Sequence, residues 1–217
     1  MSEVTIQTVL NELSEKNISK VKVAITDIDG ILRGKYIHLD KFKSAAESGF
    51  GFCNVVFGWD CADVCYDNID YTGWHSGYPD AKVKLDLSTK RNIPWDDHTP
   101  FFLGSFIDDN EKPLNICPRS ILKSIVADAE AEGLSPQVGT EFEWFNFEES
   151  SQSITEKNFQ NLKPLTPGMF GYSIIRSSQQ NTYFNQLIDQ LGAFINQTEA
   201  LESTGKLTST ESEEWIE

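Results

Sequence analysis

The 217-residue sequence has little positive charge, few cysteines and no long apolar run. Its 18 Lys and Arg residues stand against 33 Asp and Glu residues, which gives a formal net charge of −15. This balance argues against binding nucleic acid or an anionic membrane through bulk electrostatics. No stretch approaches the roughly 20 apolar residues of a membrane-spanning helix, and no apolar run follows a basic start as in a signal peptide. The resulting expectation is a cytoplasmic protein.

Cysteine offers no obvious framework for disulfides or zinc. The sequence contains four cysteines, which are Cys53, Cys61, Cys65 and Cys117. Cys61 and Cys65 are close in sequence, but no Cys or His pair lies at the spacing of a structural zinc site. We therefore predict free thiols that are buried or half-buried, and no zinc site.

Hydrophobic periodicity and turn residues predict a mixture of helices and strands. Helices are expected over 4–17, 42–48, 183–194, and from Cys117-Pro118-Arg119 to Gly133. Strands are expected over 20–26, 31–39, 82–87, 100–107 and 137–147, and residues 49–58 form a strand or a close-packed loop. The helix after Pro118 has an apolar stripe, Ile121, Leu122, Ile125, Val126 and Ala129. In the later helix we expect four residues to face inward, Phe184, Leu187, Ile188 and Leu191.

Two segments are expected to be irregular. Residues 59–80 are rich in aromatic residues, Asp and Gly, and long loops inside a compact domain are often functional. After Phe194 the composition becomes polar, acidic and rich in Ser and Thr. Such a segment has little apolar surface to bury, so we expect residues 196–217 to be disordered.

Glu141-Phe142-Glu143 is the first candidate site. Residues i and i+2 of a strand point to the same face, so the Glu141 and Glu143 carboxylates would project side by side. Two adjacent carboxylates repel each other unless a cation lies between them, and Mg²⁺ or Mn²⁺ would supply that charge. From spacing alone, a solvated strand face remains the alternative.

Val23 to Leu32, reading V-A-I-T-D-I-D-G-I-L, is the second candidate. An apolar strand that ends in D-x-D-G resembles the nucleophile motif of haloacid-dehalogenase-type phosphatases, with Asp27 as the attacking group. The alternative is a hairpin turn, because Asp and Gly are the residues that such turns require. An antiparallel hairpin over residues 20–40 would be incompatible with the phosphatase fold.

Asp60 is the third candidate, within the loop Gly58-Trp59-Asp60-Cys61-Ala62-Asp63. An acidic residue in a loop after an apolar run can attract a cation or an ammonium group. A surface aspartate that only stabilises a turn is the alternative.

Several segments, taken in order, carry a resemblance to a known family. They are Asp27 to Lys35 (D-I-D-G-I-L-R-G-K), Phe42 with Gly49 to Phe52, Pro79-Asp80 with Lys84 to Asp86 and Ile93-Pro94-Trp95, Pro118-Arg119 with Leu122, and Gly139 to Phe145 (G-T-E-F-E-W-F). In this order they resemble the glutamine synthetase family, whose members read R-G-K, P-R-x-x-L and G-x-E-x-E-F at corresponding places. The resemblance covers about residues 5–195.

The resemblance implies an α+β fold. Residues 1–115 would form an N-terminal β-grasp domain, and residues 116–195 the beginning of a catalytic domain built on a curved antiparallel sheet with helices. Residues 196–217 would be a divergent acidic tail. The implied reaction joins glutamate to ammonia, or to a larger amine, at the expense of ATP. ATP phosphorylates the substrate carboxylate, and the amine attacks the acyl phosphate.

The resemblance also implies roles for the candidate residues and the partners. Glu141 and Glu143 would each bind one of two neighbouring Mg²⁺ or Mn²⁺ ions. Asp60 would match the acidic residue that a neighbouring subunit of a homo-oligomeric ring contributes to the ammonium site. The pattern G-W-D-C-A-D departs from the usual D-G-S-S, which suits branches of the family that use larger amines.

One departure shapes the expected activity. Where the family reads E-G-L-H-T-E-x-G-P-G, residues 199–206 read E-A-L-E-S-T-G-K, and the other family ligands would follow Glu217. We therefore expect a C-terminally truncated member that is inactive on its own. The alternative is a non-catalytic scaffold or interaction protein that associates with full-length relatives.

Overall fold

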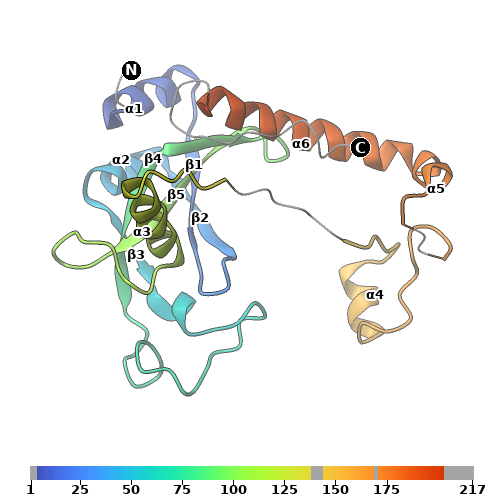
Figure 1. Cartoon of the computed structure of the whole chain (residues 1–217), viewed down its shortest axis with the longest axis horizontal. Helices are drawn as coiled ribbons and strands as arrows, with labels where there is room; N and C mark the ends of the chain where they lie inside the picture. The colour runs from blue at the N-terminus through green and yellow to red at the C-terminus, as the bar shows by residue number, and fades with distance from the viewer. Residues whose placement is uncertain (1–3, 138–143, 169–170, 203–217) are drawn as a thin grey trace.

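A five-stranded mixed sheet organises the first half of the chain in the computed structural model, which describes residues 4–137, 144–168 and 171–202 (Figure 1). The strand order is β2-β1-β5-β4-β3. The strands are β1 Lys20–Thr26, β2 Leu32–His38, β3 Phe50–Cys53, β4 Asp80–Ile93 and β5 Thr99–Ile107. Strands β1 and β5 pair in parallel, and the other neighbours are antiparallel.

Strands β1 and β2 form the predicted antiparallel hairpin, with Thr26 opposite Leu32 and Lys20 opposite His38. The turn needs a residue that tolerates a left-handed backbone, and Gly30 supplies it at φ +80°. The backbone N–H of Asp27 donates to the carbonyl of Ile31 at 2.9 Å. The D-x-D-G sequence thus acts as a hairpin turn, as one of the two interpretations predicted.

Helices α1 (Ile6–Glu15) and α2 (Leu39–Ser48) contribute buried faces to the core of this sheet. Thr5 caps α1 by accepting the N–H of Thr8, and Val9 and Leu13 are the buried residues of that helix. In α2 the Phe42 ring lies 4.7 Å from the Phe102 ring of β5, measured between centroids. The predicted helices are both confirmed, and apolar periodicity explains which faces they bury.

Strand β4 is longer than the predicted segment 82–87. Its pairing with β5 is irregular between Asp86 and Arg91 and then resumes as far as Ile93. The Thr89 hydroxyl accepts the backbone N–H of Leu103 at 2.9 Å and bridges the gap. A side chain therefore replaces a missing ladder bond, a feature that alternation of apolar and polar residues does not reveal.

A 3-10 turn, η1 (Asn54–Phe57), follows β3 and leads into the long loop predicted between Trp59 and Asp80. The buried hydroxyl of Thr72 donates to Asn54 Oδ1 at 2.6 Å and ties the middle of the loop to η1. In Figure 1 this loop extends beyond the same end of the sheet as the β1–β2 turn.

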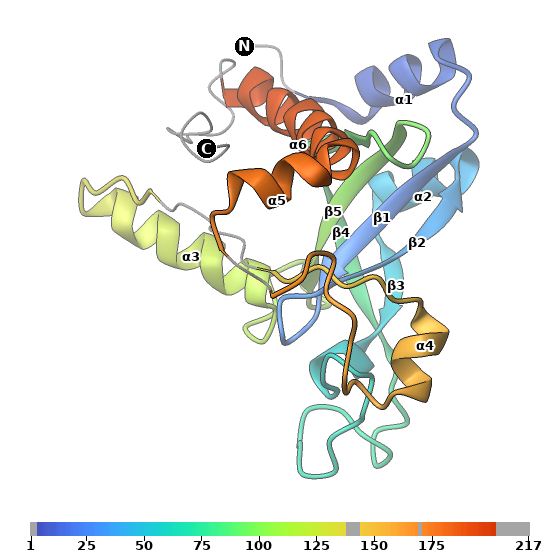
Figure 2. The same ribbon diagram turned by 90° about the vertical axis from the view of Figure 1, so that its right-hand side faces the viewer.

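Helix α3 (Pro118–Ala131) begins at Pro118, as predicted, and is followed by Gly133 at φ +78°. Its apolar stripe is not a core face. Ile121, Leu122 and Ile125 are all exposed, with 62% of Leu122 accessible to solvent. Figure 2 shows α3 projecting away from the sheet.

The second half of the chain contains α4 (Ser151–Glu156), α5 (Ile174–Gln179) and α6 (Asn181–Glu202). Helix α6 includes the predicted helix 183–194, but Ile188 and Leu191 are exposed, so the prediction that both face inward is wrong. The helix also continues to Glu202, which corrects the expectation of disorder from residue 196.

The predicted strand 137–147 falls largely on residues 138–143, which lie outside the described residues. Residues 144–146 are not in a strand, and Phe147 makes an isolated bridge to Pro164. The described residues after residue 116 therefore contain no strand of the curved antiparallel sheet that was expected there.

All four cysteines are free, as predicted. Cys117 is buried and Cys53 half-buried, but Cys61 and Cys65 are exposed, because the loop that carries them projects from the sheet. Across the described ranges, no helix combines the length and the apolar character needed to cross a bilayer.

Candidate functional site

Of the predicted site residues, the structure describes Asp60 and not Glu141 or Glu143, which lie outside the described residues. Among residues 4–137, 144–168 and 171–202, no group of three or more His, Cys, Asp and Glu side chains is placed to hold a metal ion. The geometry of the site is therefore that of the loop around Asp60.

The half-buried Asp60 carboxylate closes a tight turn in that loop. Its Oδ1 accepts the backbone N–H groups of Ala62 at 2.8 Å and of Val64 at 2.9 Å. The backbone N–H of Asp60 in turn donates to the carbonyl of Val64 at 3.1 Å. Three hydrogen bonds within five residues thus fix the conformation of this turn. Oδ1 of Asp60 stabilises the turn, as one of the two interpretations of this aspartate predicted.

Arg33, on β2, reaches this loop with its guanidinium group. Its Nη1 lies 2.5 Å from Asp63 Oδ1, and its Nη2 donates to the Asp60 carbonyl at 3.4 Å. The guanidinium carbon is 4.7 Å from the centroid of the Trp59 ring, a cation–π distance. Two motifs that are separate in sequence, the R-G-K strand and the G-W-D-C-A-D loop, are therefore one structural unit.

Asp27 completes the unit from beneath and is fully buried. Its Oδ2 pairs with Arg33 Nε at 2.7 Å, and its Oδ1 accepts the N–H groups of Asp29 at 3.0 Å and Ile31 at 2.8 Å. Both oxygens are thus engaged in the turn and the ion pair. With β1 and β2 antiparallel, this geometry is incompatible with Asp27 as a phosphatase nucleophile.

Carboxylates dominate the electrostatics around the loop. Partial desolvation, together with the negative charges of Asp29 and Asp60, raises the pKa of Tyr66. Hydrogen bonds to Asp27 and Asp63 raise the pKa of the Arg33 guanidinium, so this group is cationic at any physiological pH. A cationic ligand near Asp60 would therefore meet a field of favourable sign.

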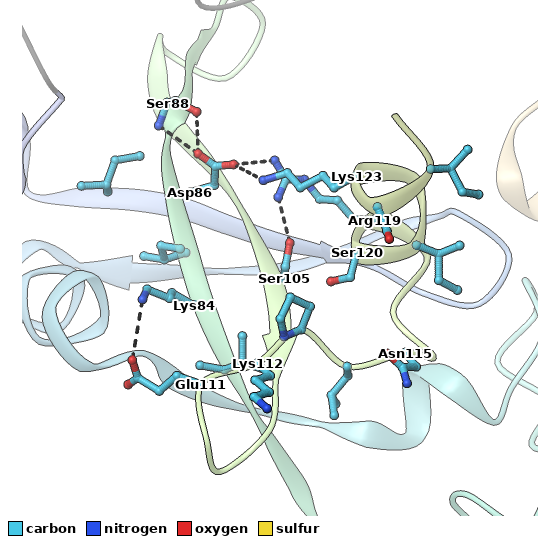
Figure 3. Close-up of a pocket in the computed structure, with 18 of the residues that line it drawn as sticks. Lys84, Asp86, Ser88, Ser105, Glu111, Lys112, Asn115, Arg119, Ser120 and Lys123 are labelled. Atoms are coloured by element: carbon cyan, nitrogen blue, oxygen red, sulfur yellow. Dashed lines mark hydrogen bonds and ion pairs between the residues drawn. The ribbon is translucent and has the colours of Figure 1, made fainter. Parts of the chain in front are cut away.

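A second polar cluster joins α3 to the sheet (Figure 3). Asp86 Oδ2, on β4, lies 2.8 Å from Arg119 Nη2 and 2.7 Å from Lys123 Nζ, both on α3. Arg119 Nη1 also donates to Ser105 Oγ on β5 at 2.8 Å. Arg119 thereby links β4 and β5 to the start of α3. It lines a groove of about 1540 Å³ between these strands and the helix.

The Asp86 cluster predicts a specific acid sensitivity. Burial by itself would raise the pKa of Asp86, but hydrogen bonds from Lys123, Ser88 and Arg119 outweigh it and hold the pKa well below its ordinary value. A carboxyl whose pKa is lower in the folded than in the unfolded state stabilises the fold above the unfolded pKa, about 3.9. That contribution is lost as the pH falls through the folded-state pKa.

We expect the free energy of unfolding, measured in urea between pH 2 and pH 6, to fall less steeply with acid in Asp86→Asn than in the parent chain. Asp109→Asn, which changes an exposed aspartate, is the matched control and should keep the parental slope. Equal slopes for Asp86→Asn and the parent would contradict the assignment of the acid sensitivity to this cluster.

Comparisons with known proteins give the family. Residues 115–210 match the family model for the glutamine synthetase catalytic domain. The chain is 48% identical over 184 residues to type-1 glutamine synthetase 2 of Dictyostelium discoideum, an alignment that covers 85% of this chain and 35% of that protein. It is 32% identical over 176 residues to the glutamate–isopropylamine ligase of a Pseudomonas species, covering 81% and 38% of the two chains.

A solved structure, the glutamine synthetase of Plasmodium falciparum, matches over 61% of this chain and 24% of that chain, with a TM-score of 0.43 and 20% identity. The chain thus spans between about a third and two fifths of the length of the curated relatives just named. With its α+β fold and these sequence matches, the chain belongs to the glutamine synthetase family. The match to the catalytic-domain model continues to residue 210, which corrects the expectation that the resemblance ends near residue 195.

The sequence singles out Asp60 but gives no sign of Arg33, which contacts its loop, or of Arg119, which joins α3 to the sheet. Both arginines lie in segments that resemble family motifs, and those motifs indicate no role for either side chain. The signal available was the charge itself, because an arginine in an otherwise β-rich run needs an acidic partner when half-buried. Which acid it would meet could not be read from spacing, since Arg33 and Asp63 are 30 residues apart.

Proposed function

We propose that this chain is the N-terminal segment of an ATP-dependent carboxylate–amine ligase that joins glutamate to ammonia or to a larger amine. The observation that carries the proposal is the family match, with 48% identity to a glutamine synthetase along 85% of the chain. The relative at 32% identity is named for isopropylamine, which favours an amine larger than ammonia as one class of substrate.

The domain organisation belongs to the same proposal. Residues 1–115 form a β-grasp domain, and the catalytic domain begins near residue 116. The hairpin β1–β2, the helix α2 that follows it and the parallel pairing of β1 with β5 support the first part. The family match that starts at residue 115 supports the second part.

Asp60 is proposed as the residue that attracts the amine, in its ammonium form, at an interface between subunits. Its Oδ1 is committed to the turn, and its Oδ2 accepts no hydrogen bond from the part of the chain that the structure describes. The exposed aromatic residue Tyr66 lies in the same loop, close enough for the negative charge of Asp60 to raise its pKa. A carboxylate beside an aromatic ring fits an alkylammonium ion better than it fits an anion.

Glu141 and Glu143 are proposed as ligands of two divalent cations. When bound, Mg²⁺ or Mn²⁺ would neutralise phosphate charge during phosphoryl transfer. Two carboxylates offer fewer oxygens than the six or so that a hard ion takes, so these residues alone are expected to bind weakly.

This assignment predicts that Glu141→Gln with Glu143→Gln weakens binding of Mn²⁺ roughly tenfold or more, because loss of even an outer partner of a metal ligand has an effect of that size. Electron paramagnetic resonance of free Mn²⁺ during titration measures it without requiring activity. Glu130→Gln with Glu132→Gln removes two exposed carboxylates at the same spacing and should leave binding unchanged. Equal losses in both double variants would reject the assignment.

The ligase proposal is tested by phosphate release from ATP with glutamate and either ammonia or isopropylamine. The purified 217-residue chain is expected to show no turnover by itself. Turnover is expected when the segment is joined to the remaining catalytic domain of the Dictyostelium relative, and Asp60→Asn should then raise the KM for the amine. A joined protein that folds and binds ATP but releases no phosphate would overturn the proposal.

A second function, association with full-length relatives, is favoured by the surface of α3. Ile121, Leu122 and Ile125 form an exposed apolar stripe on this helix, and stripes of this kind mark protein interfaces. Co-purification with the tagged Dictyostelium relative would support association. Loss of that co-purification in Leu122→Glu, with retention in Ala127→Glu at another exposed position of α3, would identify the stripe as the contact, and unchanged capture of both variants would reject it.

A further inference from the structure

Arg33 connects the sheet to the loop that carries Asp60, and three of its contacts are with that loop. The contacts are the ion pair with Asp63, the hydrogen bond to the Asp60 carbonyl and the stacking on Trp59. From these contacts we propose that Arg33 is a positioning residue, which fixes the Asp60 carboxylate for the amine substrate by way of Asp63. This inference rests on the proposed function, because it takes Asp60 as the group that attracts the amine.

The anchor of Arg33 is rigid, which is the first requirement of a positioning residue. Nε pairs with Asp27, whose side chain is fully buried and whose other oxygen closes the hairpin turn. The guanidinium plane is thus fixed at one edge by the sheet, and the remaining nitrogens project toward the loop. A planar group with several donors in a fixed geometry transmits orientation in a way that a lysine ammonium does not.

Few other contacts from the described residues hold the loop at this end. It is irregular, and Cys61, Ala62 and Val64 are exposed. The Asp60 turn is closed by its own hydrogen bonds, but these determine only the shape of the turn. The position of the turn relative to the sheet depends on contacts between the loop and residues outside it. At this end these are the contacts with Arg33, the packing of Trp59 against the core, and the hydrogen bond from the Tyr66 N–H to the Gly58 carbonyl.

Asp63 is the informative residue for a test, because it lies at the far side of Arg33 from the buried Asp27. Its side chain is 56% exposed. Asp63→Asn therefore removes the ionic contact between Arg33 and the loop while the buried pair with Asp27 is retained. Asp67→Asn changes an exposed aspartate in the same loop and is the matched control for loss of charge.

The first measurement is amide hydrogen exchange in the 217-residue chain, and it does not depend on ligase activity. In Asp63→Asn we expect the N–H groups of Ala62 and Val64, which donate to Asp60, to exchange roughly tenfold faster, the size expected for a charge-assisted bond. Exchange in β1 and β5 and the urea midpoint should be unchanged. Parental exchange at both amides would overturn the proposal.

The second measurement separates positioning from general stability and uses the joined ligase described above. Asp63→Asn is expected to raise the KM for the amine severalfold while the KM for ATP stays constant, and Asp67→Asn should change neither. Faster exchange with an unchanged amine KM in an active enzyme would overturn the role of Arg33 toward the amine. An inactive parent enzyme counts against the ligase proposal, and the exchange result still decides whether Arg33 holds the loop.

Discussion

Replacing Phe102 by alanine is expected to lower the free energy of unfolding by about 3–5 kcal/mol, the usual range for a buried phenylalanine. Phe102 lies in the middle of β5, fully inaccessible to solvent, and its ring packs against Phe42 of α2. The substitution would remove one of the contacts between the helices and the sheet and leave a cavity beside β1. Domains of this size have only about 5–15 kcal/mol of net stability, so a large part of it would be lost.

Urea unfolding followed by tryptophan fluorescence measures this effect. The matched control is Phe159→Ala, because Phe159 is 76% exposed in a loop after α4. We expect the control to change the unfolding free energy by less than about 0.5 kcal/mol. If Phe102→Ala were as mild as its control, the ring would not have the central place in the core that the structure gives it.

Local pattern predicted many of the elements in the first half of the chain, because apolar periodicity and turn residues are local signals there. The hairpin β1–β2 depends on a turn whose Asp and Gly requirements are local, and α2 follows it directly. Helix α3 shows the limit of that reasoning. Its 3.6-residue periodicity predicts a helix correctly, but periodicity does not show which surface the apolar face packs against. In the structure Leu122 of that face is exposed.

The candidate site was predictable only in part for the same physical reason. Asp60 stands out as an acid in an aromatic loop, and its turn depends on Ala62 and Val64 close by. The ion pair that gives the loop its place joins residues far apart, because Arg33 and Asp63 are 30 residues from each other. The pair that joins α3 to the sheet, Asp86 with Arg119, has a similar separation of 33 residues. Pairing over such distances is decided by the topology of the sheet, which brings β2 beside the end of the loop.

Replacing Asp27 by alanine is expected to destabilise the fold by about 3–5 kcal/mol, as is typical when one partner of a buried ion pair is removed. Asp27 is fully buried, and its loss would leave the N–H groups of Asp29 and Ile31 without their acceptor. It would also remove the anchor of Arg33, so the loss reaches from the hairpin to the Asp60 loop.

Two further variants separate the causes in the same urea measurement. Asp29→Ala, at an exposed aspartate of the same turn, should cost less than about 0.5 kcal/mol. Asp27→Asn keeps an oxygen that can accept both N–H groups, but it removes the charge and turns an NH2 donor toward Arg33 Nε. It therefore removes the ion pair and keeps the turn hydrogen bonds, so its cost should fall between those of the two alanine variants. If Asp27→Asn and Asp27→Ala were equally destabilising, the ion pair with Arg33 would account for the whole effect and the turn hydrogen bonds for none. If all three variants were mild, the buried pair would not anchor the loop, and Arg33 could not hold Asp60 in place through it.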